Sequence, residues 1–214
     1  MQSSQSKPAF KTRPWTLDGM IVNEVLRGVY TKYVQINPSD IVVDVGAHIG
    51  VFSIIASRTA AAVYAFEPQP ENYQLLLENI AKNHAENITP LNMAITDSEG
   101  ESYLKMDRMN TGGHTLVDNA VQDGWRVRTV SLDTQLPRVN FMKIDAEGSE
   151  IKVLRGASRL LDQFNVKIAM EVHGRDNLNK TIDLLANQHH YTIGWENYGL
   201  ADLYLLWAQK EIQA

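Results

Sequence analysis

The chain has 214 residues, with 20 Lys and Arg against 25 Asp and Glu, a formal net charge of −5, and no cysteine. The lack of thiols excludes a disulfide framework, a thiolate metal site and a cysteine nucleophile. The mild negative charge disfavours a nucleic-acid partner, and a hydrophobic fraction of 44% is typical of an ordinary globular domain.

The N-terminal region is predicted to be distinct from the main domain. Residues Met1–Lys7 lack the apolar core of a signal peptide, and no apolar run approaches the roughly 20 residues of a membrane span, so we expect a cytoplasmic protein that binds no membrane. Residues 1–14 are interpreted as a loosely docked tail. Helical spacing of apolar positions predicts a helix from Asp18 to Val34, either a lid over a pocket or packing at a sheet edge. We therefore expect a tail and lid helix over residues 1–38 and the main domain over 39–214.

From residue 39 onward, predicted strands and helices alternate. The run Ile41–Val45 is almost entirely β-branched, which is typical of a strand buried on both faces of a parallel sheet. Further strands are predicted at residues 62–66, 88–95, 141–144 and 166–172, and helices at 51–57, from 70 onward, at 149–161 and at 178–186. This alternation predicts an open, doubly wound α/β sheet, in which ligands bind beyond the carboxyl ends of the strands.

The C-terminal end of the chain predicts a different connection. Two strands at residues 191–196 and 203–207 are joined by a loop too short for a crossover helix, so they should form an antiparallel hairpin. The stretch from Asp97 to Asp133 is less clear, and its strands are predicted at 101–106 and 126–132.

An acidic residue and two glycines surround the turn after the first strand. Gly46 and Gly50 follow Asp44 at two and six residues, and glycines allow the backbone to turn sharply and approach a ligand closely. Glu67 ends the next strand, 23 residues after Asp44, where a carboxylate suits the two hydroxyls of a ribose. The pattern predicts a cofactor site, and the alternative is an ordinary strand–turn–helix connection.

Two cofactors compete for this turn. The dinucleotide pattern G-x-G-x-x-G fails twice, because His48 and Val51 stand where its second and third glycines belong. The observed order, an acidic residue followed by glycines two and six residues later, instead resembles motif I of the S-adenosylmethionine (SAM)-dependent methyltransferases. An NAD(P)-dependent oxidoreductase is therefore the weaker alternative.

Four segments together resemble the FkbM-type SAM-dependent methyltransferases. They are residues 44–53, 63–72, 143–150 and 171–173, so the resemblance covers about residues 40–175. The third segment is the most distinctive, whereas position 48 carries His where that family usually has Asn. The resemblance implies a Rossmann-like doubly wound methyltransferase fold, with a mostly parallel seven-stranded sheet and a reversed C-terminal strand. It also implies methyl transfer to a hydroxyl of a sugar or a secondary metabolite.

The same resemblance implies roles for individual residues. The first turn would line the methionine end of SAM, and Glu67 would bind the ribose. Ala94 and Asp97 would lie near the adenine, and Asp145 would lie near the sulfonium and the acceptor; for Asp97 and Asp145 the alternative is a loop or helix cap. The full set assigned to the cofactor is Asp44, Gly46, Ala47, His48, Gly50, Glu67, Ala94, Asp97 and Asp145.

An alcohol is a poor nucleophile, so methyl transfer to oxygen requires a group that takes the hydroxyl proton. His173, directly after the fifth strand, is the first candidate because its ordinary pKa of about 6.5 suits the task, and His114 is the second. With Asp145 they are the predicted catalytic residues. Asp145, Glu147, Glu171 and His173 are hard ligands that would suit Mg²⁺, but the acids could equally pair with nearby lysines, so no resident metal is predicted.

Two other function classes stay open at this point. A nucleic-acid methyltransferase would need an Asn/Asp-Pro-Pro-aromatic motif where this chain has residues 145–148, or a cysteine for C5 methylation. A non-catalytic SAM-binding module or subunit differs from an enzyme only in turnover. Because little of the chain lies outside the sheet, we expect a small hydroxylated acceptor, or one shared with a partner subunit in a homo-oligomer.

Overall fold

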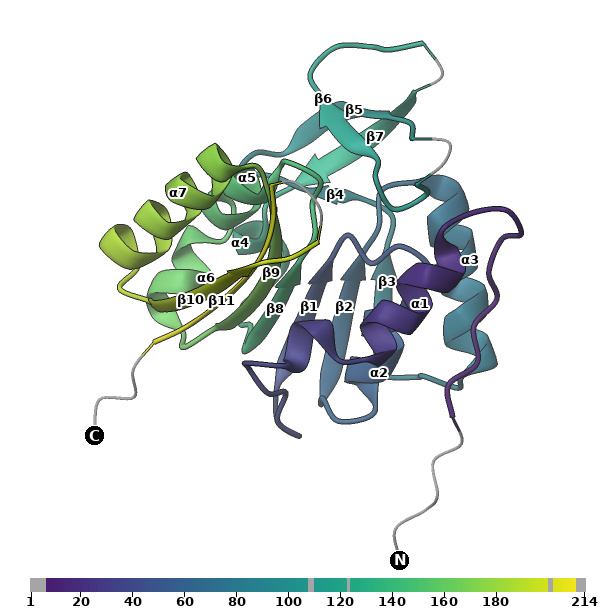
Figure 1. Ribbon diagram of the computed structural model, residues 1–214, viewed down its shortest axis with the longest axis horizontal. Helices are drawn as coiled ribbons and strands as arrows, with labels where there is room; N and C mark the ends of the chain where they lie inside the picture. Colours follow the sequence, from purple (N-terminus) through teal and green to yellow (C-terminus); the bar gives the residue numbers. More distant parts are fainter. Residues whose placement is uncertain (1–6, 108–109, 123, 200–201, 211–214) are drawn as a thin grey trace, which may run out of the picture.

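The computed structural model describes residues 7–107, 110–122, 124–199 and 202–210, and it has a mixed sheet of seven strands at its centre (Figure 1). Its strand order is β10-β11-β9-β8-β1-β2-β3. The strands are β1 (Ile41–Val45), β2 (Ala62–Phe66), β3 (Ile88–Leu91), β8 (Phe141–Ile144), β9 (Lys167–His173), β10 (Thr192–Asn197) and β11 (Leu203–Gln209). β11 pairs antiparallel with both β9 and β10, whereas the pairs β9–β8, β8–β1, β1–β2 and β2–β3 are parallel. The predicted doubly wound sheet with a reversed last strand is therefore confirmed.

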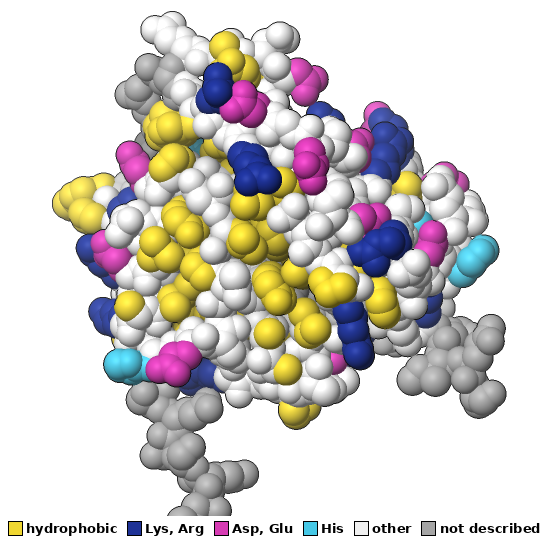
Figure 2. All heavy atoms as spheres, turned by 180° about the vertical axis from the view of Figure 1, so that it is seen from behind, with side chains coloured by type: hydrophobic (Ala, Val, Ile, Leu, Met, Phe, Trp, Pro, Cys, Tyr) yellow, Lys and Arg dark blue, Asp and Glu magenta, His cyan; other side chains and the backbone are white. Residues whose placement is uncertain are grey.

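Helices cover both faces of this sheet, and each face has its own hydrophobic cluster. Leu154, Leu160 and Leu178 belong to one cluster, and Ile54 and Leu76 belong to the other. The helices are α1 (Asp18–Leu26), α2 (Val51–Ser57), α3 (Pro70–Lys82), α4 (Leu132–Gln135), α5 (Glu150–Arg155), α6 (Ser158–Gln163) and α7 (Arg175–Asp183), with a 3₁₀ turn η1 (Val29–Thr31) and a π-helical turn η2 (Leu184–Gln188). Figure 2 shows the molecule from behind. On this side, hydrophobic side chains gather in the middle of the surface, and most charged side chains lie around them. In the described residues no helix is long and apolar enough to cross a bilayer.

A second, four-stranded sheet of order β4-β7-β5-β6 stands over the carboxyl ends of the parallel strands (Figure 1). Its strands are β4 (Ala94–Ile95), β5 (Gly100–Lys105), β6 (Thr115–Val117) and β7 (Trp125–Val130). The single strand predicted at 88–95 was wrong, because the chain leaves the main sheet after Leu91. The Asn92 side-chain amide donates to the carbonyl oxygens of Glu67 (2.9 Å) and Pro68 (3.1 Å) at this bend, and Ala94 then pairs with Thr129 in the second sheet.

Two predicted helices have other bounds than expected, and a glycine lies at each point of difference. The helix predicted from Asp18 to Val34 ends at Leu26, since Gly28 has a left-handed backbone with φ of 82°. The helix predicted over residues 149–161 is divided at Gly156, where a Cβ atom would lie 2.0 Å from the carbonyl oxygen of Thr96. Gly156 therefore lets the chain after β4 pass close to the end of α5.

The N-terminal segment is firmly attached where the structure describes it. Asn79 on α3 and Asn83, directly after that helix, accept from the backbone N–H groups of Lys11 (2.6 Å) and Ala9 (3.0 Å). Their side-chain amides donate back to the carbonyl oxygens of Lys11 (3.2 Å) and Ala9 (2.8 Å). Residues 1–6 lie outside the described part, but from Ala9 onward the interpretation as a loose tail was wrong.

Candidate active site

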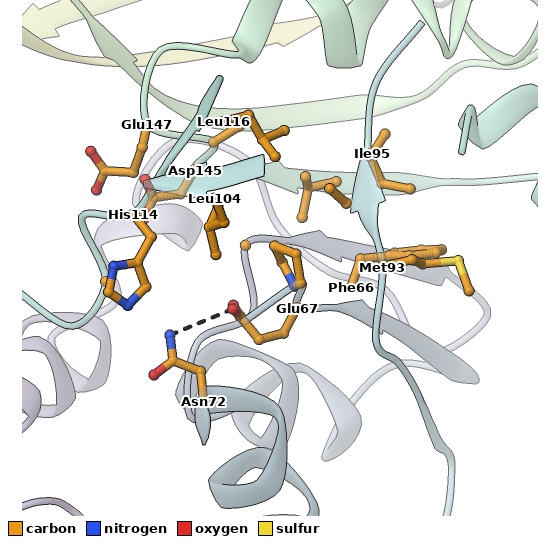
Figure 3. A pocket seen from close by; sticks show the side chains of 16 residues that line it. Phe66, Glu67, Asn72, Met93, Ile95, Leu104, His114, Leu116, Asp145 and Glu147 are labelled. Atoms are coloured by element: carbon orange, nitrogen blue, oxygen red, sulfur yellow. Dashed lines mark hydrogen bonds between the residues drawn. The ribbon is translucent and has the colours of Figure 1, made fainter. Parts of the chain in front are cut away.

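Two adjoining cavities lie at the carboxyl ends of the parallel strands. The first lies between the ends of β1 and β2 and the second sheet, which contributes Leu104 and Leu116 (Figure 3). The second is wider and lies between the strand ends and α1. Five residues line both cavities: Gly46, Glu67, Gly112, Asp145 and Glu147. The two spaces therefore share a wall, and ligands in each would meet there.

The glycine turn predicted from the sequence forms part of that wall. Gly46 has φ of 73°, and a Cβ atom there would lie 2.0 Å from the carbonyl oxygen of Asp145. His48 is also left-handed, with φ of 52°, a conformation that Asn and His adopt more readily than most residues. Ala47 and His48 line the second cavity, whereas Gly50 lines neither and instead packs on Leu76 of α3.

Asp44 supports the turn from below and does not line either cavity. Its inaccessible carboxylate accepts from Ser53 Oγ (2.6 Å) and lies 3.2 Å from Lys143 Nζ. Lys143 Nζ also donates to the carbonyl oxygen of Gly46 at 2.7 Å. Burial alone would lower the pKa of Lys143, but the charges of Asp44 and Asp145 outweigh it and raise that pKa. A buried cation therefore fixes the cofactor turn.

Glu67 lies where a ribose-binding carboxylate is expected. One oxygen accepts the N–H of His48 (2.8 Å), the other accepts the N–H of Gln69 (2.9 Å), and burial raises the pKa of the carboxyl group. Asn72 lies beside it, with its amide nitrogen 3.5 Å from Glu67 Oε1 (Figure 3). Asn72 Oδ1 and Asp145 Oδ1 are buried and have no hydrogen-bond partner among the described residues, and both residues line the first cavity. These polar groups fit a ligand with hydroxyl and amine donors, as SAM has.

Of the two residues predicted to lie near the adenine, one lines the first cavity and the other does not. Ala94 lines the first cavity together with Met93 and Ile95. Asp97 is exposed and lies outside the cavity lining, with its Cα close to Gly156. The reason is the bend after Leu91, which carries the chain into the second sheet before Asp97 is reached.

A buried cluster at Asp18 joins three distant segments. Asp18 is fully buried and receives hydrogen bonds from the Arg13 guanidinium (3.0 Å) and from Thr111 Oγ1 (2.7 Å), and it lies 3.4 Å from His48 Nε2. Burial would raise the pKa of Asp18, but the hydrogen bonds from His48 and Arg13 lower it well below its usual range. We call Arg13, Asp18, His48 and Thr111 the Asp18 cluster; it connects the N-terminal segment to the cofactor turn and to the loop before β6.

Carboxylates crowd the inner wall of the second cavity. The Tyr30 hydroxyl donates to Glu171 Oε1 at 2.5 Å and lies 3.3 Å from Asp145 Oδ2. Burial and the nearby charge of Asp145 raise the pKa of Glu171 to about 8, and burial with the same charge raises that of Glu147 to about 7. A group with a pKa near neutrality is suited to proton transfer.

His173 is held between two of these carboxylates. Its Nδ1 lies 2.9 Å from Glu150 Oε1, and its Nε2 lies 3.3 Å from Glu147 Oε2. Although burial lowers the pKa of His173, the hydrogen bond with Glu150 and the charge of Glu147 raise it to about 9. The ring is therefore protonated at neutral pH, which argues against the predicted role of His173 as the base.

His114 lies on the other side of the shared wall. It lines the first cavity and not the second, and its Nδ1 accepts the N–H of Asp107 at 3.0 Å. Burial, followed by the charges of His48 and Arg13, lowers the pKa of His114. Its position beside the cofactor cavity makes it a poor base for an acceptor in the second one.

One group of side chains has the composition of a metal site. Ligand atoms of Asp145, Glu171 and His173 all lie within 4.8 Å of one another. Here both ring nitrogens of His173 already lie against carboxylates of Glu147 and Glu150, and Lys143 Nζ lies 3.9 Å from Asp145 Oδ2. The group is better described as an ion-pair network.

Tyr30, Lys143 and Asp18 were not identified as site residues from the sequence. Tyr30 lies in a region predicted only as helix, and its partner Glu171 is 141 residues away in the chain. Lys143 belongs to the most distinctive of the four segments, and a cationic residue two positions before Asp145 was the available signal.

The seven-stranded fold and its two joined cavities define a Rossmann-like methyltransferase. A model of the methyltransferase FkbM domain matches residues 44–193, so the chain belongs to the FkbM methyltransferase family. SAM is accordingly the cofactor. This confirms the family, fold and cofactor that the sequence motifs predicted.

Three similar proteins illustrate the range of this family. The hexuronic acid methyltransferase AglP of Haloferax volcanii is 31% identical over 139 residues, which are 63% of this chain and 56% of that protein. The 31-O-demethyl-FK506 methyltransferase FkbM of Streptomyces tacrolimicus is 24% identical over 197 residues, 75% of each chain. The crystal structure of methyltransferase FkbM from Methylobacillus flagellatus KT has a TM-score of 0.64 and 22% identity, covering 83% of this chain and 45% of that one. The matched part of this chain spans a little over half of the length of AglP and less than half of the Methylobacillus chain. The likeness to the crystal structure concerns the fold alone.

Proposed function

We propose that this chain transfers the methyl group of SAM to a hydroxyl oxygen of a small-molecule acceptor. The observation that carries the proposal is the shared wall of the two cavities, to which Gly46, Asp145 and Glu147 contribute. A cofactor in the first cavity and an acceptor in the second would be held next to each other at this wall. Such positioning accounts for much of the rate in a transfer between two bound molecules.

The first cavity would bind the cofactor through its polar residues. Glu67 and Asn72 would hold the ribose side, and Gly46 leaves room for close approach of the ligand to the backbone. SAM supplies, when bound, a methyl group on a positively charged sulfonium. Asp145 and Glu147 place negative charge at the shared wall, which favours a cation there.

Glu171 is the residue that we assign as proton acceptor for the hydroxyl. It lines the second cavity and not the first. Among the described side chains only Tyr30 donates a hydrogen bond to its carboxylate, at Oε1, which leaves Oε2 for the acceptor. Its pKa of about 8 makes the ionised carboxylate a strong base, and the ionised fraction increases as the pH approaches 8.

His173 and Lys143 would position the carboxylates around the hydroxyl. The protonated His173 ring fixes Glu147 and Glu150, and Lys143 fixes Gly46 and Asp44. Neither cation is placed to take a proton, since each is stabilised in its charged form.

The proposal is tested with SAM labelled in its methyl group and a panel of hydroxylated acceptors. We expect acceptor-dependent formation of S-adenosylhomocysteine (SAH), with the label recovered in an ether that survives mild base. SAH binding without turnover on any acceptor would favour a non-catalytic SAM-binding module. Tight NADH binding with no binding of SAM or SAH would contradict the proposal outright.

A further inference from the structure

We infer that the acceptor of this reaction is an uncharged amphiphilic alcohol, with its reacting hydroxyl on a polar part that bears no carboxylate or phosphate and with an apolar part that packs on α1. This inference rests on the proposed methyl transfer and specifies the molecule that the second cavity accepts. It follows from the two unlike walls of that cavity.

The inner wall is rich in acidic side chains, and among the residues that the structure describes it offers no free cation to an anion. Lys143 is the only Lys or Arg among the described residues that line the second cavity. Its ammonium is buried and directed at the Gly46 carbonyl oxygen (2.7 Å) and at Asp44 (3.2 Å). The second cation, His173, is held by Glu147 and Glu150. The acids that line the cavity are Glu24, Glu67, Asp145, Glu147, Glu171 and Asp202.

Anionic acceptors are disfavoured by this arrangement. Carboxylate and phosphate groups are usually recognised by Arg forks or by Lys, and like charges brought together without compensation repel strongly where water is partly excluded. A uronate or a sugar phosphate in this cavity would face several carboxyl groups and, in the described part of the chain, no available Arg or Lys. A neutral hydroxyl can instead donate to Glu171.

The outer wall is apolar and unusually exposed. Leu17, Met20, Ile21 and Val25 line it from the start and first turns of α1. Met20 is 69% exposed and Leu17 is 38% exposed, and the neighbouring Trp15 is 98% exposed. Large apolar side chains that gather beside a cavity are typical of a ligand-binding surface. Here they face a polar floor, so the ligand they suit has one apolar and one polar part.

The acceptor inferred from the two walls differs from the acceptor in the name of one relative. AglP is named as a hexuronic acid methyltransferase, and a hexuronic acid is both anionic and without an apolar part. If the acceptor of this chain were of that kind, the second cavity would be expected to contain a free Arg or Lys. The specificity inferred for this chain is therefore different from that of AglP.

A set of three sugar probes tests both parts of the inference. The SAH-loaded protein is titrated with octyl β-D-glucopyranoside, methyl β-D-glucopyranoside and octyl β-D-glucuronide below their micellar concentrations. Each Kd is measured by NMR at pH 8.5, where the Glu147 and Glu171 carboxylates are mostly ionised. We expect the octyl glucoside to bind at least tenfold more tightly than either other probe. Equal or tighter binding of the glucuronide overturns the charge argument, and equal binding of the methyl glucoside overturns the apolar wall. Failure of all three probes to bind overturns both.

Matched variants locate the effect on the two walls. Met20→Ser should reduce the advantage of the octyl over the methyl glucoside at least threefold, whereas Leu26→Ser should not. Leu26 is on the same helix and 46% exposed but does not line the cavity, so an equal effect of both variants would mean non-specific adsorption and would overturn the inference. Glu171→Gln should narrow the preference for the glucoside over the glucuronide. The SAH titration that precedes these measurements tests the proposed function separately. A protein that does not bind SAH would contradict the proposed function. SAH binding without selectivity among the probes would contradict only the inferred acceptor class.

Discussion

Lys143 Nζ donates a hydrogen bond to the carbonyl oxygen of Gly46 at 2.7 Å, which connects the motif after β8 to the cofactor turn after β1. The same nitrogen lies 3.2 Å from the buried carboxylate of Asp44. One side chain thus fixes the shape of the turn and neutralises the charge beneath it.

Replacing Lys143 by Met should therefore be strongly destabilising. The change leaves Asp44 charged and without its cation in the interior, which typically costs about 3–5 kcal/mol of unfolding free energy. Urea denaturation followed by circular dichroism measures this loss. The double variant Asp44→Asn/Lys143→Met should lose less than the sum of the two single changes, because it leaves no unpaired charge; additive losses would show that the pair is not coupled.

Glu67→Ala should weaken SAH binding at least tenfold, or about 1.4 kcal/mol. The carboxylate organises the N–H groups of His48 and Gln69 and is the proposed partner of the ribose. Isothermal titration calorimetry gives the affinity, and Glu99→Ala, at an exposed position, is the control. An unchanged SAH affinity in Glu67→Ala would remove the ribose assignment.

Glu171→Gln should lower kcat by about 10²–10⁴-fold, the usual contribution of a general base, while SAH affinity stays within threefold. The wild-type rate should rise with pH and level off above about 8, since the carboxylate accepts a proton only in its ionised form. Tyr30→Phe removes a hydrogen bond that lowers the pKa of Glu171, so it should shift this inflection to higher pH. An unchanged pH profile in Tyr30→Phe, or full activity in Glu171→Gln, would contradict the assignment.

His173 should make stability depend on pH. Its pKa is raised from 6.5 to about 9 in the folded protein, so the proton stabilises the native state. This contribution is complete below pH 6.5 and disappears as the pH rises through 9. It amounts to at most about 3 kcal/mol. Wild type and His173→Gln are compared by thermal unfolding at pH 6 and pH 9.5, and the difference between them should be large at the lower pH and small at the higher one.

Asp18→Asn should loosen the Asp18 cluster. The variant removes the charge that binds Arg13 and weakens the hydrogen bond from Thr111, at a cost of about 1–3 kcal/mol. Hydrogen exchange of the amides at residues 111–113 should become faster than in the wild type. Asp176→Asn, at an exposed position, should leave their exchange unchanged.

The sheet and one wall of the site could be predicted from the sequence because they depend on local patterns. The β-branched strands and the short C-terminal loop determine the topology. Gly46, Glu67 and Asp145 lie directly after parallel strands, and the carboxyl ends of such strands meet at one edge. Their positions therefore follow from the topology.

Other features depend on contacts between distant parts of the chain. Ala94 leaves the main sheet because its partner Thr129 is 35 residues further on, and this carries Asp97 away from the cavity. Tyr30 reaches Asp145 and Glu171 across more than 100 residues. The residue type of His173 suggested a base. The carboxylates of Glu147 and Glu150 on either side of its ring stabilise the protonated form, which cannot accept a proton.

The apolar wall comes from a segment that precedes β1, whereas all the residues proposed for the cofactor follow it. The N-terminal segment is held by its side-chain contacts with α3 and by the Asp18 cluster, and it takes no strand in either sheet. The residues that would contact the apolar part of the acceptor and those that would contact the cofactor therefore lie in different parts of the sequence. Substitutions at Leu17, Met20 and Ile21 would therefore alter the apolar wall while leaving Tyr30, the Asp18 cluster and the residues proposed for the cofactor in place.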